Sequence, residues 1–393
     1  MSSVAPRNSS STAVAARSRP SARIDLAIGW DALDRLAPDW ERLFVQHPRP
    51  VPWSSPAGLR ALRTTWTDTR EPLAATVSQN GLVRLILPLE LVRRGPFLTV
   101  RGLGRGAFHR FEPLVGADAA LYQPGEVLRG IVRRLRRPVL FDVAGLWPEA
   151  PGARWLGEAV HDAPGWFPSE GALDYEVPLE PSWPAEHAAI RRSFRDRAAR
   201  GAERARSGGG LATTIFRADT AEDLGFLFEL VRRRGRFLDG RAGRAIARLA
   251  EESAGTGRLL LGRTMHAGRP VAGLALWIGR AQAIELLAAH DPQAEALAPD
   301  AALRIEAIRV LVEQERVRSL VMPPGQKPDT AGLCAAPRRQ LRLWGAPVGG
   351  ALRLTARAAA WYGREDSAVP GLVRTLVNMT RGWSGTARRA FRR

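Results

Sequence analysis

A histidine and an aspartate stand together at the end of an expected buried strand, as His290 and Asp291. Histidine is a suitable general base near neutral pH, and a neighbouring carboxylate can take a proton through water. The following loop leads to Pro299 and Asp300, and apolar spacing predicts a helix from Ala301 to Glu315 with Asp300 as its N-cap. Because a helix N-terminus attracts anions, this corner is a candidate acid–base and anion-binding site. A plain strand–loop–helix corner without chemistry is the alternative.

A second candidate is the arginine-rich stretch from Arg191 to Arg206, which ends at three glycines. Its low apolar content predicts a largely exposed helix. We expect Arg191, Arg192 and Arg195 to hold phosphates or another anionic group, because guanidinium groups bind oxyanions with two parallel hydrogen bonds. Lys327, the only lysine, is a further candidate for this role. The alternative is a solvated helix that links two domains.

The composition excludes several classes of protein. The 393 residues are enough for two or three domains. Cys334 is the only cysteine, which excludes an intramolecular disulfide and a zinc site with two cysteine ligands. The six histidines are scattered, so we expect no metal site. The glycine-rich segment from Arg101 to Gly106 lacks the spacing of a dinucleotide-binding loop and is interpreted as a tight turn.

The net charge of +19, from 58 basic and 39 acidic residues, has two interpretations. It indicates an anionic partner, or it reflects a composition in which nearly every basic residue is arginine. Nucleic acid is not expected as a partner, because the sequence has no recognition motif for it. The basic segment 351–393 is expected to be helical and could contact an anionic membrane, although a helical tail on the protein body is the simpler alternative.

The pattern of helices and strands divides the chain into four parts. Residues 1–22 are expected to be a disordered tail, 23–175 and 176–350 two α/β domains, and 351–393 the basic tail. In the first domain we expect a helix over Asp31 to Phe44 and a hairpin at Asn80 and Gly81. Each domain has a helix pair, a strand, and a glycine turn that leads into an apolar strand. This similarity predicts a duplicated α/β unit with a mixed sheet.

The order and spacing of these segments resemble the GNAT-superfamily acetyltransferase-like proteins named after CelD of cellulose biosynthesis, which are related in fold to Fem-type transferases. The resemblance runs from Trp30 to Lys327. The segments that carry it are Ser54–Trp66, Arg101–Val115, Phe141–Pro151, His266–Gly279 and His290–Ile308.

The resemblance implies a tandem pair of GNAT-like domains that transfer an acyl group, expected to be acetyl, from acyl-CoA to an amine or hydroxyl. It implies that the acyl thioester lies along an open edge between the strands near Leu276 and Leu286, with His290, or Asp291 through water, as base. The pyrophosphate is then expected at the corner formed by residues 289–302. The cofactor-binding residues expected at this corner are Pro299, Asp300 and Ala301.

The resemblance also implies a polysaccharide- or envelope-related acceptor. The single cysteine fits a cytoplasmic protein, which the basic tail could hold at the inner face of the membrane. The corner contains no glycine-rich pyrophosphate loop. This departure favours a second hypothesis, in which the chain is a non-catalytic GNAT-like scaffold that binds an anionic polysaccharide, lipid or protein.

Overall fold

A computed structural model of the chain describes residues 22–66, 70–94, 97–108, 110–116, 122–162, 165–235, 237–322, 333 and 336–346. Within these residues, one 13-stranded mixed sheet has the order β1-β2-β3-β4-β6-β13-β7-β12-β11-β10-β9-β8, and β5 pairs with β3. The strands are β1 (Arg23–Ile28), β2 (Arg70–Gln79), β3 (Leu82–Arg94), β4 (Phe97–Gly102), β5 (Leu114–Val115), β6 (Val139–Leu146), β7 (Trp166–Pro178), β8 (Ala212–Arg217), β9 (Leu259–His266), β10 (Arg269–Ile278), β11 (Gln282–His290), β12 (Ser319–Met322) and β13 (Ala336–Gly345). The α-helices are α1 (Trp30–Arg35), α2 (Ala37–Gln46), α3 (Pro56–Thr64), α4 (Pro124–Leu135), α5 (Pro151–Asp162), α6 (Trp183–Ala189), α7 (Arg192–Ala205), α8 (Gly225–Arg234), α9 (Arg241–Ser253) and α10 (Pro299–Val310).

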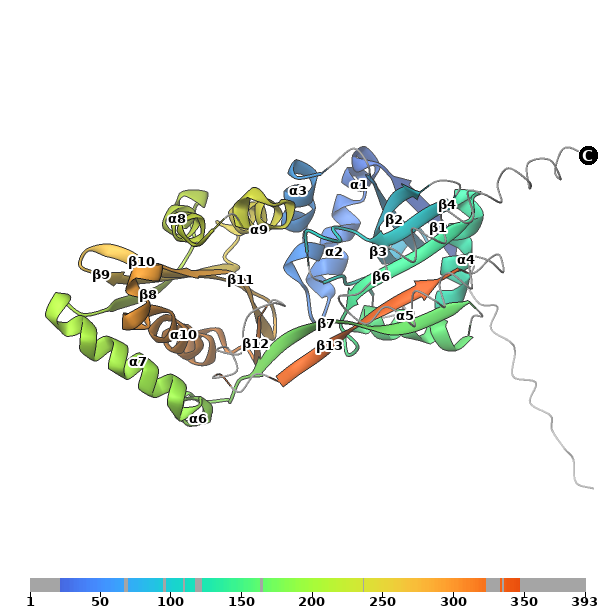
Figure 1. The fold of residues 1–393 in the computed structure, drawn as a ribbon. Helices are drawn as coiled ribbons and strands as arrows, with labels where there is room; N and C mark the ends of the chain where they lie inside the picture. The colour runs from blue at the N-terminus through green and yellow to red at the C-terminus, as the bar shows by residue number, and fades with distance from the viewer. Residues whose placement is uncertain are drawn as a thin grey trace, which may run out of the picture.

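Helices cover both faces of the sheet in the second half of the chain. α8 and α9 lie on one face, and α7 and α10 lie on the other (Figure 1). Every residue of β10 from Val271 to Ile278 is buried, because the strand has helices on both sides and a paired strand at each edge. This explains why the sequence of β10 is a continuous apolar run instead of an alternating one.

The two halves repeat one order of elements, as the sequence predicted. β2, β3, β4, α4 and β6 in the first half correspond to β9, β10, β11, α10 and β12 in the second. The last strand of each set is parallel to the third, and the other described strand pairs are antiparallel. The predicted hairpin turn at Asn80 and Gly81 is confirmed, with φ values of 51° and 76° that match the favoured two-residue turn. The predicted mixed α/β fold is therefore confirmed.

Strands β7 and β13 join the two halves into one sheet. β7 pairs with β12 through Tyr175 to Pro178 and with β13 along most of its length. β13 also pairs with β6, so a strand from the C-terminal part lies within the sheet of the first half. The halves also meet through side chains: Arg60 Nε of α3 lies 2.7 Å from Glu252 Oε2 of α9. These contacts hold the two halves in one arrangement.

The sequence prediction for the first helix was wrong in one detail, which has a local cause. The helix expected from Asp31 to Phe44 is broken at Leu36 into α1 and α2. Pro38 explains the break, because proline lacks an N–H donor and obstructs the preceding helical turn. The predictions for residues 1–21, for the basic tail 351–393, and for Lys327 and Cys334 lie outside the described residues.

Candidate functional site

The predicted site in the second half lies where β11 loses a neighbouring strand. β11 pairs with β12 only from Gln282 to Ile284. From Glu285 to His290 its outer edge has no partner strand among the described residues, so backbone N–H and C=O groups there can bind another extended chain. A β-bulge coincides with this opening, since Leu276 lies opposite Glu285 and Ala275 opposite Leu287, which leaves Leu286 as the extra residue.

The side chains of Leu276 and Leu286, which the resemblance placed at the cofactor, are packed inside the protein. Both side chains are buried, with 1% and 4% of their surface exposed, and belong to opposite faces of the sheet. The prediction that the open edge lies between their strands was wrong, because β10 and β11 pair with each other and the open edge lies on the other side of β11, towards β12. Leu286 is the bulged residue, and no bulge was predicted from the sequence. The side of the strand that opens depends on the strand order.

A buried ion pair fixes α10 against β11 at the start of this opening. Glu285 of β11 accepts two hydrogen bonds from Arg304 of α10, at 2.5 and 3.1 Å. The Glu285 side chain is fully buried and that of Arg304 is 11% exposed. Burial opposes the charge on Arg304, but the Glu285 carboxylate outweighs it and raises the pKa of the guanidinium. Arg304 therefore stays charged, and its hydrogen bonds to Glu285 set the position of the helix relative to the strand.

The corner between β11 and α10 differs from the sequence prediction in its cap. The N-cap of α10 is Ala298, with φ of 44° and no side-chain hydrogen bond, so the prediction that Asp300 caps the helix was wrong. Asp300 lies one residue inside the helix, where its carboxylate accepts a hydrogen bond from Arg197 of α7. Pro299 and Ala301 are buried, so their side chains are not available to a ligand.

Asp291 has a structural partner on each side. Its Oδ1 accepts a hydrogen bond of 2.9 Å from the backbone N–H of Gln293 and so caps the short 3-10 helix Pro292–Leu297. Its Oδ2 lies 3.5 Å from Arg233 Nη1 of α8. The side chain is 6% exposed. These contacts position the loop that follows β11.

His290 is partly buried at the end of β11, opposite Ala272 of β10. Burial lowers the pKa of its imidazole from the usual 6.5, while Asp300 acts in the opposite direction and Arg234 adds to the lowering. The ring is therefore neutral at pH 7, which is the form that can accept a proton. His290 and Asp300, at the two ends of this loop, are therefore close enough to interact electrostatically.

The arginines at the corner are not those that the sequence indicated. Arg191 precedes α7, and Arg192 is 88% exposed at the start of the helix. Arg195 is partly buried. Instead, Arg197 binds the carboxylate of Asp300, and Arg204 Nη1 donates a hydrogen bond of 2.9 Å to the carbonyl oxygen of Ala296. These two residues are seven apart and therefore on one face of the helix, a spacing that was visible in the sequence.

Gly201 lies between these two arginines and allows α7 to approach the corner closely. A Cβ atom at this position would lie 2.0 Å from the backbone oxygen of Leu297. We expect Gly201→Ala to lower the free energy of unfolding by about 1–3 kcal/mol, because backbone on both sides must move. Gly157→Ala in α5 is the matched control, since its Cβ would meet nothing within 4 Å and alanine favours helix. Urea unfolding of both variants tests this, and equal stability of the two would contradict the close contact.

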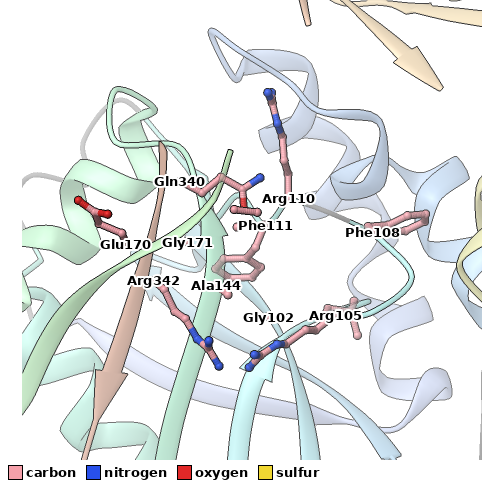
Figure 2. Close-up of a pocket in the computed structure, with 13 residues that line it drawn as sticks. Gly102, Arg105, Phe108, Arg110, Phe111, Ala144, Glu170, Gly171, Gln340 and Arg342 are labelled. Carbon is pink, nitrogen blue, oxygen red and sulfur yellow. The ribbon is translucent and has the colours of Figure 1, made fainter. Parts of the chain in front are cut away.

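A cavity of about 260 Å³ lies in the first half, away from the predicted site residues. Figure 2 shows the side chains of its lining, which come from the turn after β4 and from β6, β7 and β13. The glycine-rich turn from Arg101 to Gly106 forms one wall, and the φ values of Gly104 and Gly106 are 80° and 81°. The interpretation of this segment as a tight turn is confirmed. Its part in a cavity was not predicted.

One family model matches most of the second half of the chain. Residues 192–328 match the family model described as Acetyltransferase (GNAT) domain. The second half has a GNAT-type fold. The matched region contains the open edge of β11, the corner and all of α7. No curated protein matches the chain.

Solved structures share the fold over most of the chain. A conserved protein of unknown function from Bacteroides thetaiotaomicron has a TM-score of 0.53 and 11% identity, over 79% of this chain and 97% of that one. FemX has a TM-score of 0.52 and 10% identity, over 78% and 95%. A tandem GNAT protein from the clavulanic acid biosynthesis pathway has a TM-score of 0.41 and 13% identity, over 84% and 100%. At these identities the first two matches show that the fold is shared, and nothing about substrates.

Two features are absent from the part of the chain that the structure describes. No group of three or more His, Cys, Asp or Glu side chains there is arranged to hold a metal ion. No described helix is both long and apolar enough to cross a membrane.

Proposed function

We propose that the protein is a GNAT-type N- or O-acyltransferase that moves an acyl group, acetyl being expected, from acyl-CoA to an amine or hydroxyl. The observation that carries this proposal is the open edge of β11, which starts at a β-bulge inside the region that matches an acetyltransferase domain. The amide groups of a pantetheine chain can pair with such an edge as an added strand. A backbone N–H of the bulge would polarise the thioester carbonyl.

The corner offers charge for the phosphates of the donor, although it has no glycine-rich loop. Arg197 from α7 binds Asp300, Arg233 from α8 lies 3.5 Å from Asp291, and Arg204 from α7 binds the carbonyl oxygen of Ala296. Arg197 lies at the N-terminus of α10, where a phosphate is favoured, and Arg204 lies at the loop that precedes this helix. We therefore infer that side chains replace the usual loop amides in holding the pyrophosphate.

In the proposed reaction, the amine or hydroxyl of the acceptor attacks the thioester carbonyl. His290 takes the proton of the attacking group as the tetrahedral intermediate forms. The carbon–sulfur bond then breaks, the acyl group stays on the acceptor, and the CoA thiolate leaves and is protonated. Asp291 is held by Gln293 and Arg233, and in this mechanism it positions His290. The envelope- or polysaccharide-related acceptor is proposed on the resemblance to CelD-type proteins alone.

Calorimetric titration with acetyl-CoA tests the donor site, with CoA and ATP as controls at low and high salt. We expect saturable binding that survives the higher salt. Arg197→Gln should weaken it about tenfold or more, because a charge-assisted hydrogen bond is worth roughly 1.5–3 kcal/mol. Arg192→Gln removes the same charge from an exposed position of the same helix and should leave the affinity unchanged. Equal losses in both variants would mean that only the general charge of the surface attracts the ligand.

The non-catalytic scaffold is the second candidate, and one observation favours it. α7 already lies against the corner, with Gly201 in close contact with Leu297 and Arg197 bound to Asp300. If these contacts persist with a donor present, the phosphates have less room at the helix N-terminus. Binding that ATP matches and that salt abolishes would support the scaffold and contradict the acyltransferase.

A further inference from the structure

The cavity in the first half lies at a point where two parallel strands separate. β4 pairs with β6 from Leu98 to Arg101 and then turns away after Gly102, while β6 continues to Leu146. The loop returns to β6 through a 2.9 Å hydrogen bond from Phe111 N–H to the carbonyl oxygen of Gly145. The cavity of about 260 Å³ lies in this gap, large enough for a small organic molecule. It corresponds in the repeat to the open edge of β11.

One end of this cavity concentrates positive charge around a single buried carboxylate. Asp142, 2% exposed, is bound by Arg105 and by Arg342, whose Nε lies 2.9 Å from its Oδ1. Arg101 Nε lies 3.7 Å from the other carboxylate oxygen. Figure 2 shows the guanidinium groups of Arg105 and Arg342 pointing towards each other. Three guanidinium groups on one carboxylate leave the balance of this cluster positive.

Burial makes this charge costly. The burial of Arg342 lowers its pKa to about 10, far below that of an exposed arginine, so the cation is held in poorly solvated surroundings. A second anion at this end would repay part of that desolvation cost.

Arg110 supplies a second buried cation that lines the same cavity. Its side chain is 4% exposed, and its Nε donates a hydrogen bond of 2.8 Å to Oδ2 of Asp174. The central carbon of its guanidinium group lies 3.9 Å from the ring centre of Trp147. Nη1 and Nη2 have no hydrogen-bond partner among the described residues. Figure 2 shows this side chain pointing away from Arg105 and Arg342. A buried guanidinium with two unused donor nitrogens is expected to have a ligand or water as partner.

Apart from Gln340 and Glu170, the rest of the lining consists of apolar side chains and small residues. Phe108 and Phe111 line the cavity together with the small residues Gly145 and Gly171. Glu170 also contributes to the lining, but it is an exposed residue whose carboxylate lies 2.7 Å from Arg339. The acidic group therefore has its own surface partner, and the buried part of the lining has aromatic rings beside basic groups.

We propose that this cavity binds a small organic anion, whose carboxylate or phosphate oxygens bind Arg105 and Arg342 and whose apolar body contacts Phe108 and Phe111. The inference concerns a binding site in the first half and does not depend on the acyl transfer proposed for the second half.

Calorimetric titration of the full chain at 0.3 M salt tests the proposal with phenyl phosphate, benzoate and the neutral benzyl alcohol. We expect at least one of the two anions to bind about tenfold or more tightly than benzyl alcohol. The tighter of the two identifies the oxyanion that the site prefers. Binding of both anions no tighter than that of benzyl alcohol would overturn the proposal.

Arg342→Gln should weaken binding of the preferred anion by about tenfold or more. The matched control is Arg206→Gln, which removes a charge that is 75% exposed on the second half and should change nothing. Arg342→Lys keeps the charge next to Asp142 but loses the guanidinium fork, so an intermediate loss is expected even if the glutamine variant does not fold. Unchanged affinity in a folded Arg342 variant would overturn the proposal.

Discussion

Replacing His290 by alanine should lower the rate of acyl transfer by about 10²- to 10⁴-fold and leave acetyl-CoA affinity nearly unchanged. The residue ends the open strand β11, and its partly buried ring is neutral at pH 7 because burial lowers the pKa of the imidazole. A general base contributes to the transition state more than to substrate binding, so kcat falls while the dissociation constant stays constant. Steady-state kinetics and calorimetry of the same preparation measure the two quantities.

The pH profile gives an independent test of this role. The wild-type rate should fall as the pH drops through the pKa of His290, which burial lowers from the usual 6.5, because the imidazolium cannot accept a proton. The acid limb should be lost in His290→Ala. His266→Ala is the matched control, since His266 is partly buried at the end of β9 and binds the carbonyl oxygen of Gly210 at 3.0 Å. Turnover that survives in His290→Ala, or an acid limb that persists there, would remove His290 from the mechanism.

The largest effect on stability is expected from Arg304→Ala, which should lower the free energy of unfolding by about 3–5 kcal/mol. The substitution leaves Glu285, whose side chain is fully buried, without the two hydrogen bonds from Arg304. The carboxylate must then be protonated or hydrated inside the protein, and both cost free energy. Urea unfolding at pH 7 measures the loss.

The same helix provides a control for this prediction. Arg309 of α10 also binds carboxylates, those of Glu306 and Glu313, but its side chain is 40% exposed. Arg309→Ala should therefore cost about 1 kcal/mol or less. The double variant Glu285→Leu/Arg304→Met should recover most of the stability, because it removes both buried charges. A loss for Arg304→Ala as small as for Arg309→Ala would show that the pair does not hold α10 against β11.

The sequence predicted most of the elements around the candidate site. Alternation and apolar runs indicated β9, β10 and β11, and the turn residues Asn80 and Gly81 indicated the first hairpin. The same local signals predicted the repeat of one α/β unit in both halves. These features are encoded within a few residues of each other, since strand period, helix period and turn conformation depend on near neighbours in the chain.

Other features depend on contacts between distant segments. Strand β13 lies between β6 and β7, and no local pattern specifies which strand a given edge accepts. The phase of α7 brings Arg197 and Arg204 to the corner and leaves Arg192 exposed, because the buried face is set by the close contact of Gly201 with Leu297. The sequence predicted Asp300 as the N-cap of α10, whereas the structure has Ala298 there. The reason is similar, since the Asp300 carboxylate pairs with an arginine from another helix.

The sequence by itself therefore determined the α/β class, the two similar halves and the segment from His290 to Asp300 as the candidate corner. Only the tertiary structure decided which edge of β11 is open, which arginines surround the corner, and that a cavity with Arg110 and Arg342 exists in the first half. The physical reason is that periodicity records which residues are buried, whereas strand order and helix packing decide which buried or charged groups meet.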